Sequence, residues 1–320
     1  MPSLSMNRGS IRLFRLAGVD VFLHWWWFLV AFYEIGSRNG RYSSVSWNIA
    51  EYLALFLIVL THEFGHAMAC RQVGGTADRI LLWPLGGVAY VDPPQRPGAM
   101  LWSIAAGPLV NVALMPILFG AIYFRLGGAW PDSMTDLDQF LFAVLKINFW
   151  LLAFNILPIY PLDGGKIVWA LLWFFLGRAR SLYIATILGF IGIAGYLFFA
   201  LRSGYTWLVI MAVYLVFNCW ASFKYARGLM EFDKLPRRGG FACPSCRKAP
   251  PIGAYWRCGQ CQQGFDTFQT GSVCPHCGAA SSGTVCLDCR RTSPMSEWVK
   301  GGGTAGASGT FGQTDLTGTL

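Results

Sequence analysis

Long apolar segments separated by short polar stretches make up most of the first 225 residues. A helix needs about 20 predominantly apolar residues to cross the ~30 Å hydrocarbon core of a bilayer. A shorter apolar run at 21–36 follows a basic start and lacks a cleavage site of small residues, which predicts an uncleaved first span. Five longer segments predict further membrane-spanning helices, at 48–70, 98–124, 139–158, 182–201 and 205–223.

Two other segments depart from this pattern. The apolar run at 166–177 is too short to span a membrane, so we expect a half-helix or an interfacial helix. Residues 79–92 have strand-forming arms on either side of Gly86 and Gly87, which predict a short β-hairpin dipping toward the membrane, with a plain loop as an equal alternative. The expected fold class is an all-α polytopic membrane protein with about six transmembrane helices and a short membrane-associated β-hairpin.

The composition supports a membrane protein. Of the 320 residues, 54% are hydrophobic and 13% are charged, against roughly 25% charged residues in a typical soluble domain. The mean hydropathy is +0.44. So much apolar surface cannot be buried within one water-soluble domain of this size, which excludes a disordered, collagenous or ordinary cytosolic chain.

The distribution of charge predicts the orientation in the membrane. The formal net charge is +9, and Lys and Arg gather in 1–19, 71–97 and 164–181, all on one side of the expected spans. The loop at 127–139, on the other side, holds three Asp. By the positive-inside rule, both termini of this integral, multi-pass membrane protein face the cytoplasm.

The chain divides into segments of different composition. After residue 225 it changes from apolar to basic and then to cysteine-rich, and its Gly/Thr-rich end predicts disorder. We expect a cytoplasmic segment at 1–18, a membrane domain at 19–225, a basic linker at 226–242, a cysteine module at 243–290 and a disordered tail at 291–320.

The expected span at 48–70 contains the sequence His62-Glu-Phe-Gly-His66. Residues four apart lie on one face of a helix, so both imidazoles can reach one metal ion and Glu63 can act on a water molecule there. Ionisable groups at the centre of a span cost roughly 2.5 kcal/mol or more, so they need partners or a function. The alternative is an interhelical polar cluster that holds the helices together.

A third metal ligand is expected at Asp163, in the sequence Asn155-Ile-Leu-Pro-Ile-Tyr-Pro-Leu-Asp163. Catalytic zinc takes three protein ligands and keeps one position open. Pro158 and Pro161 cannot both sit in an undistorted helix, so the chain must kink or unwind here. Irregular backbone at membrane depth is tolerated where it lines a cavity or is buried in protein. A helix cap at the membrane surface is the alternative for Asp163 considered alone.

Eight cysteines fall between Cys243 and Cys289, in four C-x2-C pairs. Four thiolates at this spacing form closed structural zinc sites, and so small a module cannot build a core without metal. The pairs predict tandem zinc ribbons in a reducing compartment. We assign Cys243, Cys246, Cys258 and Cys261 to one zinc ion, and Cys274, Cys277, Cys286 and Cys289 to the other.

Two of these motifs carry a resemblance to a known family. The H-E-F-G-H sequence, followed later by N-x-x-P-x-x-P-L-D-G-G, resembles the site-2 protease family of intramembrane metalloproteases. Gly107-Pro-Leu-Val-Asn111 resembles an intervening element of that family, and Leu85-Gly-Gly87 resembles its membrane-associated strand. The similarity covers about 12–225 and ends before the cysteine module.

The resemblance implies roles for the matching residues. One catalytic zinc ion would be held by His62, His66 and Asp163, in addition to two structural zinc ions in the cysteine module. Glu63 would be the general base, and Asn155 would hydrogen-bond the substrate backbone or the oxyanion.

The resemblance also implies where a substrate binds. Gly86, Gly87 and Val88 would form a strand edge that pairs with an unwound substrate segment. Asn111 would line the substrate site, with a buried helix-packing role as an equal alternative.

We therefore expect an intramembrane zinc endopeptidase that cleaves in or near a transmembrane segment, as in regulated intramembrane proteolysis. Its expected partners are a membrane-protein substrate with an unwound segment, the lipid bilayer and a cytosolic protein at the ribbons; nucleic acid is not expected. The alternatives are a non-catalytic membrane scaffold, whose ribbons recruit a cytosolic partner, and a metal transporter. Glu63 favours the enzyme, because a scaffold needs no base.

Overall fold

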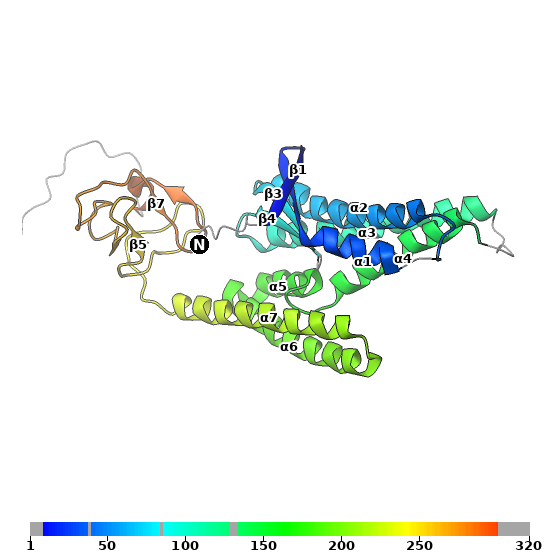
Figure 1. Cartoon of the computed structure of the whole chain (residues 1–320). Helices are drawn as coiled ribbons and strands as arrows, with labels where there is room; N and C mark the ends of the chain where they lie inside the picture. The colour runs from blue at the N-terminus through cyan, green and yellow to red at the C-terminus, as the bar shows by residue number, and fades with distance from the viewer. Residues whose placement is uncertain (1–8, 38–39, 84–85, 128–133, 300–320) are drawn as a thin grey trace, which may run out of the picture. The chain divides into compact units, whose positions relative to one another are not determined.

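The structure is a computed structural model that describes residues 9–37, 40–83, 86–127 and 134–299. It forms two compact units, which divide between Asp233 and Lys234 (Figure 1). The first unit is mainly helical, and the second contains short strands and loops. Each unit is described by itself below.

The first unit contains the expected long membrane helices. Within the described residues, five helices are long and apolar enough to cross a membrane. They match the five longer apolar segments of the sequence, which confirms a helical polytopic membrane unit. These helices are α2 (Val45–Gln72), α3 (Pro97–Leu126), α4 (Asp136–Ile156), α6 (Arg178–Ser203) and α7 (Thr206–Asp233).

The expected first span at 21–36 is wrong. This segment forms strand β2 (Val19–His24) and helix α1 (Trp26–Ser37), and 12 helical residues extend only about 18 Å. The physical reason is a two-residue period, because Val19, Val21 and Leu23 are buried on one face of β2. Among the described residues, the unit therefore has five long apolar helices where the sequence predicted about six spans.

The hairpin expected at 79–92 is present, but it is half of a larger sheet. Strands β1 (Ser10–Leu16), β2, β3 (Thr76–Trp83) and β4 (Gly86–Asp92) lie side by side in that order. The two hairpins, β1–β2 and β3–β4, are antiparallel, and β2 pairs with β3 in parallel. The segment expected as a cytoplasmic tail at 1–18 thus contributes a strand to this sheet.

The sheet packs on the C-terminal half of α2. Buried side chains of β2 and β3, among them Val21 and Ile80, share one core with Leu60 and Cys70 of α2. This packing leaves β4 at the end of the sheet, next to the helix turn that carries the H-E-x-x-H sequence. The sheet therefore brings a strand edge to the candidate site.

The chain unwinds after α4 and restarts as the expected half-helix, α5 (Asp163–Leu176). Its first turn packs very closely on the preceding backbone. A Cβ atom at Gly164 would lie 2.2 Å from the carbonyl oxygen of Ile156, and one at Gly165 would lie 2.3 Å from the nitrogen of Tyr160. These two glycines let α5 start beside the end of α4, which fixes the position of Asp163.

The second unit is built around aromatic side chains and the cysteine pairs. Phe268 contacts Phe241, Trp256 and Trp298, with ring centroids 5.0–5.2 Å apart. Two short antiparallel strand pairs and one 3-10 helix complete the described part of the unit. They are β5 (Trp256–Arg257) with β6 (Gly264–Phe265), β7 (Thr284–Val285) with β8 (Thr292–Ser293), and η1 (Met295–Trp298).

The structure shifts the boundaries expected for this region. Residues 226–233 complete α7, and Arg237 and Arg238 pair with Asp288 and Asp266 inside the second unit, so 226–242 is not a separate linker. Residues 291–299, expected as part of a tail at 291–320, belong to this unit, since Trp298 is 1% exposed in its aromatic core. Residues 300–320 lie outside the described residues.

The contact between α2 and α3 gives a test of this packing. Gly65→Ala should destabilise the protein by about 1–3 kcal/mol, because the new Cβ would lie 2.7 Å from the carbonyl oxygen of Ala106. Gly120→Ala on α3 is the matched control, since no atom lies within 4 Å of its Cβ position. Thermal unfolding in detergent measures both, and equal melting temperatures for the two variants would contradict the packing.

Candidate metal centres

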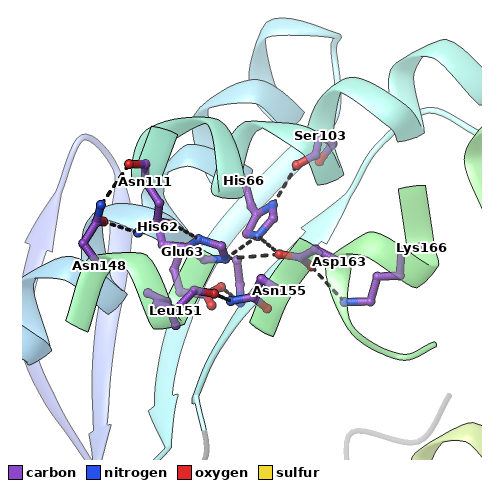
Figure 2. Close-up of polar contacts among 11 residues, drawn as sticks. His62, Glu63, His66, Ser103, Asn111, Asn148, Leu151, Asn155, Asp163 and Lys166 are labelled. Atoms are coloured by element: carbon purple, nitrogen blue, oxygen red, sulfur yellow. Dashed lines mark hydrogen bonds and ion pairs between the residues drawn. The ribbon is translucent and has the colours of Figure 1, made fainter. Parts of the chain in front are cut away.

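Three ligand atoms meet in the interior of the first unit. His62 and His66 extend from α2, and Asp163 extends from the first turn of α5. Asp163 Oδ2 lies 3.1 Å from Nε2 of each histidine, and the two Nε2 atoms are 3.2 Å apart. All three residues are buried. Figure 2 shows their side chains pointing to one position.

The outer nitrogen of each imidazole is held by an oxygen. His62 Nδ1 lies 2.6 Å from Asn111 Oδ1, and His66 Nδ1 lies 2.9 Å from the carbonyl oxygen of Ser103. A carbonyl oxygen can only accept, so both Nδ1 atoms donate, and a neutral ring then has a lone pair on Nε2. Two lone pairs and a carboxylate oxygen therefore face one another, which is favourable only around a cation.

The spacing of these atoms also fits zinc. Ligands bound at about 2.0–2.1 Å in a tetrahedron lie roughly 3.3 Å apart. The observed separations of 3.1–3.2 Å are close to that value. His62, His66 and Asp163 thus provide the ligand type, protonation and spacing that a zinc ion with three protein ligands requires.

Asn111 holds one of the candidate metal ligands in place through hydrogen bonds. Its Oδ1 contacts His62, its Nδ2 donates to Asn148 Oδ1 at 2.8 Å, and Asn148 Nδ2 donates to the Asn111 carbonyl oxygen at 3.0 Å. Both asparagines are fully buried, which favours the buried helix-packing role of Asn111 over a place in the lining of the substrate site. Sequence analysis missed Asn148, although an asparagine inside an apolar span is a visible signal.

Helix α3 presents one face to the two histidines. Ser103, Gly107 and Asn111 are spaced four residues apart, as His62 and His66 are. A Cβ atom on Gly107 would lie 2.2 Å from His66 Nε2, so glycine is required there for the imidazole to fit. Gly107 therefore leaves room for the His66 ring, and Asn111 holds the His62 ring in place.

The Glu63 side chain extends from α2 to the edge strand β4. Its Oε2 accepts a hydrogen bond from the backbone N–H of Ala89 at 2.8 Å. A Cβ atom on Gly87 would lie 2.3 Å from Glu63 Cγ, so this glycine leaves the space that the side chain occupies. The structure brings Gly87 to Glu63, and Gly86 and Val88 flank it on β4, with Val88 exposed.

Asn155 and Lys166 lie on either side of the unwound segment. Asn155 Nδ2 donates to the carbonyl oxygen of Leu151 at 3.1 Å, within its own helix. Lys166, which sequence analysis did not single out, has its Nζ 3.5 Å from Asp163 Oδ1. Figure 2 shows this lysine on the side of Asp163 away from the histidines, where its charge stabilises the carboxylate.

The cysteines form two clusters, but with a different grouping from the one expected. The first and last C-x2-C pairs come together, and so do the two middle pairs, so the sites are nested and fold as one unit. Spacing along the chain cannot determine such long-range partners. The clusters are Cys243, Cys246, Cys286 and Cys289, and Cys258, Cys261, Cys274 and Cys277.

The geometry of both clusters fits structural zinc. Sulfur atoms of facing pairs lie 3.5–3.7 Å apart, close to the roughly 3.8 Å between thiolates bound tetrahedrally at about 2.3 Å. All eight cysteines are free of disulfides. Backbone N–H groups of Cys261 and Gln260 lower the pKa of the Cys258 thiol to about 6, which favours the thiolate that binds metal.

Comparisons with known proteins agree with this site. The chain matches the model of peptidase family M50 over residues 50–137 and 131–199, which include the three buried ligands. A zinc metalloprotease of Methanocaldococcus jannaschii is 31% identical over 211 residues, covering 65% of this chain and 59% of the relative. Rip3 of Mycobacterium tuberculosis is 30% identical over 240 residues, covering 69% of this chain and 58% of the relative.

A solved site-2 protease structure from Methanocaldococcus jannaschii also matches, with 28% identity and a TM-score of 0.49, over 67% of this chain and 95% of that one. Within the first unit, residues 50–199 are the part of the chain that belongs to peptidase family M50. The chain spans about three-fifths of the length of the curated relatives it matches. The family match ends before the cysteine module.

The contact between Asn111 and His62 predicts an effect on metal affinity. Asn111→Ala should weaken zinc binding at the membrane site about 10–100-fold, because the ring loses the acceptor that fixes its tautomer and orientation. Asn218→Ala on α7 is the control, since the half-buried Asn218 side chain donates to the Tyr214 carbonyl oxygen of its own helix and lies outside the metal cluster. Metal analysis across a chelator titration measures both, and equal affinities would exclude this supporting role.

The nested clusters predict which cysteine substitutions remove the same zinc ion. Cys246→Ser and Cys286→Ser should each lose one zinc ion, and the double variant should lose no more than either single variant. Combining Cys246→Ser with Cys258→Ser should lose two, although the sequence-based grouping puts both cysteines in one site. Metal analysis of purified protein decides between the groupings, because the tandem arrangement gives the opposite result for each pair.

Proposed function

We propose that this protein is an intramembrane zinc endopeptidase that hydrolyses a peptide bond in or near a transmembrane segment of a membrane-protein substrate. The observation that carries this proposal is the buried cluster of His62, His66 and Asp163, with Glu63 beside it at a strand edge. Buried ionisable groups in a membrane helix mark function, and this set matches a hydrolytic zinc site.

In this proposal, metal binding, proton transfer and orientation of the base are carried out by different residues. His62, His66 and Asp163 hold the zinc ion, which when bound polarises the scissile carbonyl and makes water a stronger nucleophile. Glu63 takes the proton from the attacking water and gives it to the leaving amine. The Ala89 N–H orients Glu63 in the absence of substrate, and Lys166 keeps Asp163 ionised.

A substrate segment would bind in an extended form along β4. A helix buries its own carbonyl groups, so the scissile segment must unwind to reach the site. Strand β4 is at the end of the sheet, and Gly86, Gly87 and Val88 offer backbone groups for strand addition. Asn155, at the end of α4, is placed by this proposal against the substrate backbone or the oxyanion.

The proposed orientation places both termini in the cytoplasm. Arg71, near the C-terminal end of α2, donates to the carbonyl oxygens of Ala17 and Gly18, so the N-terminal hairpin lies at that end of the helix. Arg12 and Arg15 on β1 and Arg79 on β3 lie in the same sheet, which supports a cytoplasmic side here under the positive-inside rule. The membrane would be a bacterial-type cell membrane, and the activity a step of regulated proteolysis.

The second unit would hold two structural zinc ions and recruit a cytosolic protein. Exposed apolar side chains such as Ile252 and Tyr255 support a protein partner over nucleic acid. A purely non-catalytic scaffold is the alternative function. It does not explain why Glu63 occupies a niche that Gly87 keeps open beside the metal ligands.

Glu63→Gln should keep three bound zinc ions and lower cleavage by about 10²–10⁴-fold. The amide keeps the size of the side chain and its acceptor for the Ala89 N–H, but it is not a base. Asp163→Asn is the matched variant, and it should retain only the two ribbon zinc ions, because a neutral amide is a poorer ligand for the dication. Metal analysis and cleavage of co-reconstituted single-span membrane proteins measure both effects.

Full cleavage by purified, zinc-loaded Glu63→Gln protein would overturn the proposed mechanism. Wild-type protein with intact ribbons and no third zinc ion would overturn the metal site itself. A loss of zinc in Glu63→Gln would show that Glu63 serves as a ligand and not as the base.

A further inference from the structure

A positive charge lies at the centre of a membrane helix, away from the metal centre. Lys146 is the eleventh of the 21 residues of α4, and its side chain is exposed. No ion pair of the described residues includes Lys146, whereas Glu51, Asp138 and Asp163 each have a basic partner. A charge at this depth is costly unless a partner or water neutralises it, so its presence calls for a function.

Lys146 lies on a groove between α3 and α4. The groove has a volume of about 490 Å³ and is lined mainly by apolar side chains, with Arg41 and Gln139 as its other polar members. The Arg41 guanidinium pairs with Glu51. Met115 and Phe119 line the groove from α3, and Phe142 and Phe149 from α4. A ligand that matches this groove in shape and charge would have an apolar surface with one negatively charged group opposite Lys146.

The groove is separate from the catalytic site. Asn148, two residues after Lys146, points to Asn111 behind the metal ligands. Two residues correspond to about 200° of rotation on a helix, so Lys146 faces the opposite side of α4. A ligand in the groove therefore meets the outside of the bundle and does not contact His62 or Asp163.

Two possible sources of negative charge do not reach Lys146. Lipid phosphates lie about 15 Å from the middle of a ~30 Å hydrocarbon core, which is farther than a lysine side chain extends. A second copy of this chain offers no exposed acid near the middle of its described spans, because Glu51, Glu63 and Asp163 are buried. The remaining source is a carboxylate on a membrane helix of another protein.

We propose that the groove between α3 and α4 binds a transmembrane helix of a partner protein, through an acidic residue near the middle of that helix. The partner carboxylate pairs with Lys146, and its neighbouring apolar side chains fill the space between Phe119 and Phe149. This docking does not depend on catalysis, so it holds or fails independently of the proposed protease activity.

The test uses the full chain in proteoliposomes with a synthetic transmembrane helix. The probe is a Leu/Ala-rich peptide of about 21–23 residues with a central Glu, and its control has Leu at that position. Both carry an acceptor dye, so energy transfer from the labelled protein measures binding. The Glu63→Gln background suppresses cleavage of the probe by the proposed protease activity.

We expect the central-Glu peptide to bind about tenfold more tightly than the central-Leu peptide, from the ion pair formed out of water. Lys146→Met should remove this difference, and Lys146→Glu should transfer the preference to a peptide with a central Lys. Lys224→Met on α7 is the matched control, since Lys224 lies over the Trp220 ring and outside the groove.

Thermal unfolding confirms that each variant is folded before binding is compared. Equal binding of the two peptides to the parent protein would overturn the proposal and leave a hydrated lysine in an open groove. The proposal is also overturned if Lys146→Met protein still prefers the central-Glu peptide. It is overturned likewise if the preference for that peptide changes only with the anionic lipid content of the vesicles.

Discussion

The membrane unit depends on holding three electron-rich atoms within 3.2 Å of one another in an apolar interior. Two imidazole lone pairs and a carboxylate repel each other there unless a cation lies among them. Each ligand must also be oriented by a further polar group, which itself needs a partner. Asn111, its neighbour Asn148 and the Ser103 carbonyl meet this need from α3 and α4. The three candidate ligands thus determine which faces of the surrounding helices can be polar.

The same constraint explains where this chain needs glycine. Gly65 brings the backbones of α2 and α3 into contact, and Gly107 gives His66 its place between them. Gly87 opens the space for Glu63, and Gly164 lets α5 start against the end of α4. In each case an added Cβ atom would meet an atom at 2.8 Å or less. Close approach at these four positions places elements from distant parts of the sequence around one point.

Sequence analysis found the features that depend on local pattern. The five long helices follow from apolar length, and the spacing in H-E-x-x-H brings His62 and His66 to one helix face. The features it missed depend on distant segments. Pairing of β2 with β3 converted an apparent apolar span into a strand, and the cysteine pairs close in a nested order. Neither is encoded in the spacing of neighbouring residues, and both required the fold.

In the proposed mechanism, the sheet on α2 makes proteolysis at membrane depth possible. An unwound segment at membrane depth exposes backbone groups that hydrocarbon cannot satisfy. Strand β4 offers such groups at its outer side, which pairs with no described strand, and its Ala89 N–H already binds the proposed base. A substrate carbonyl that takes this N–H would free the Glu63 carboxylate for the attacking water. In the proposed mechanism, β4 therefore provides hydrogen bonds that offset the cost of unwinding the substrate. The same binding event releases the Glu63 carboxylate from the Ala89 N–H, so the base becomes available only when substrate is bound.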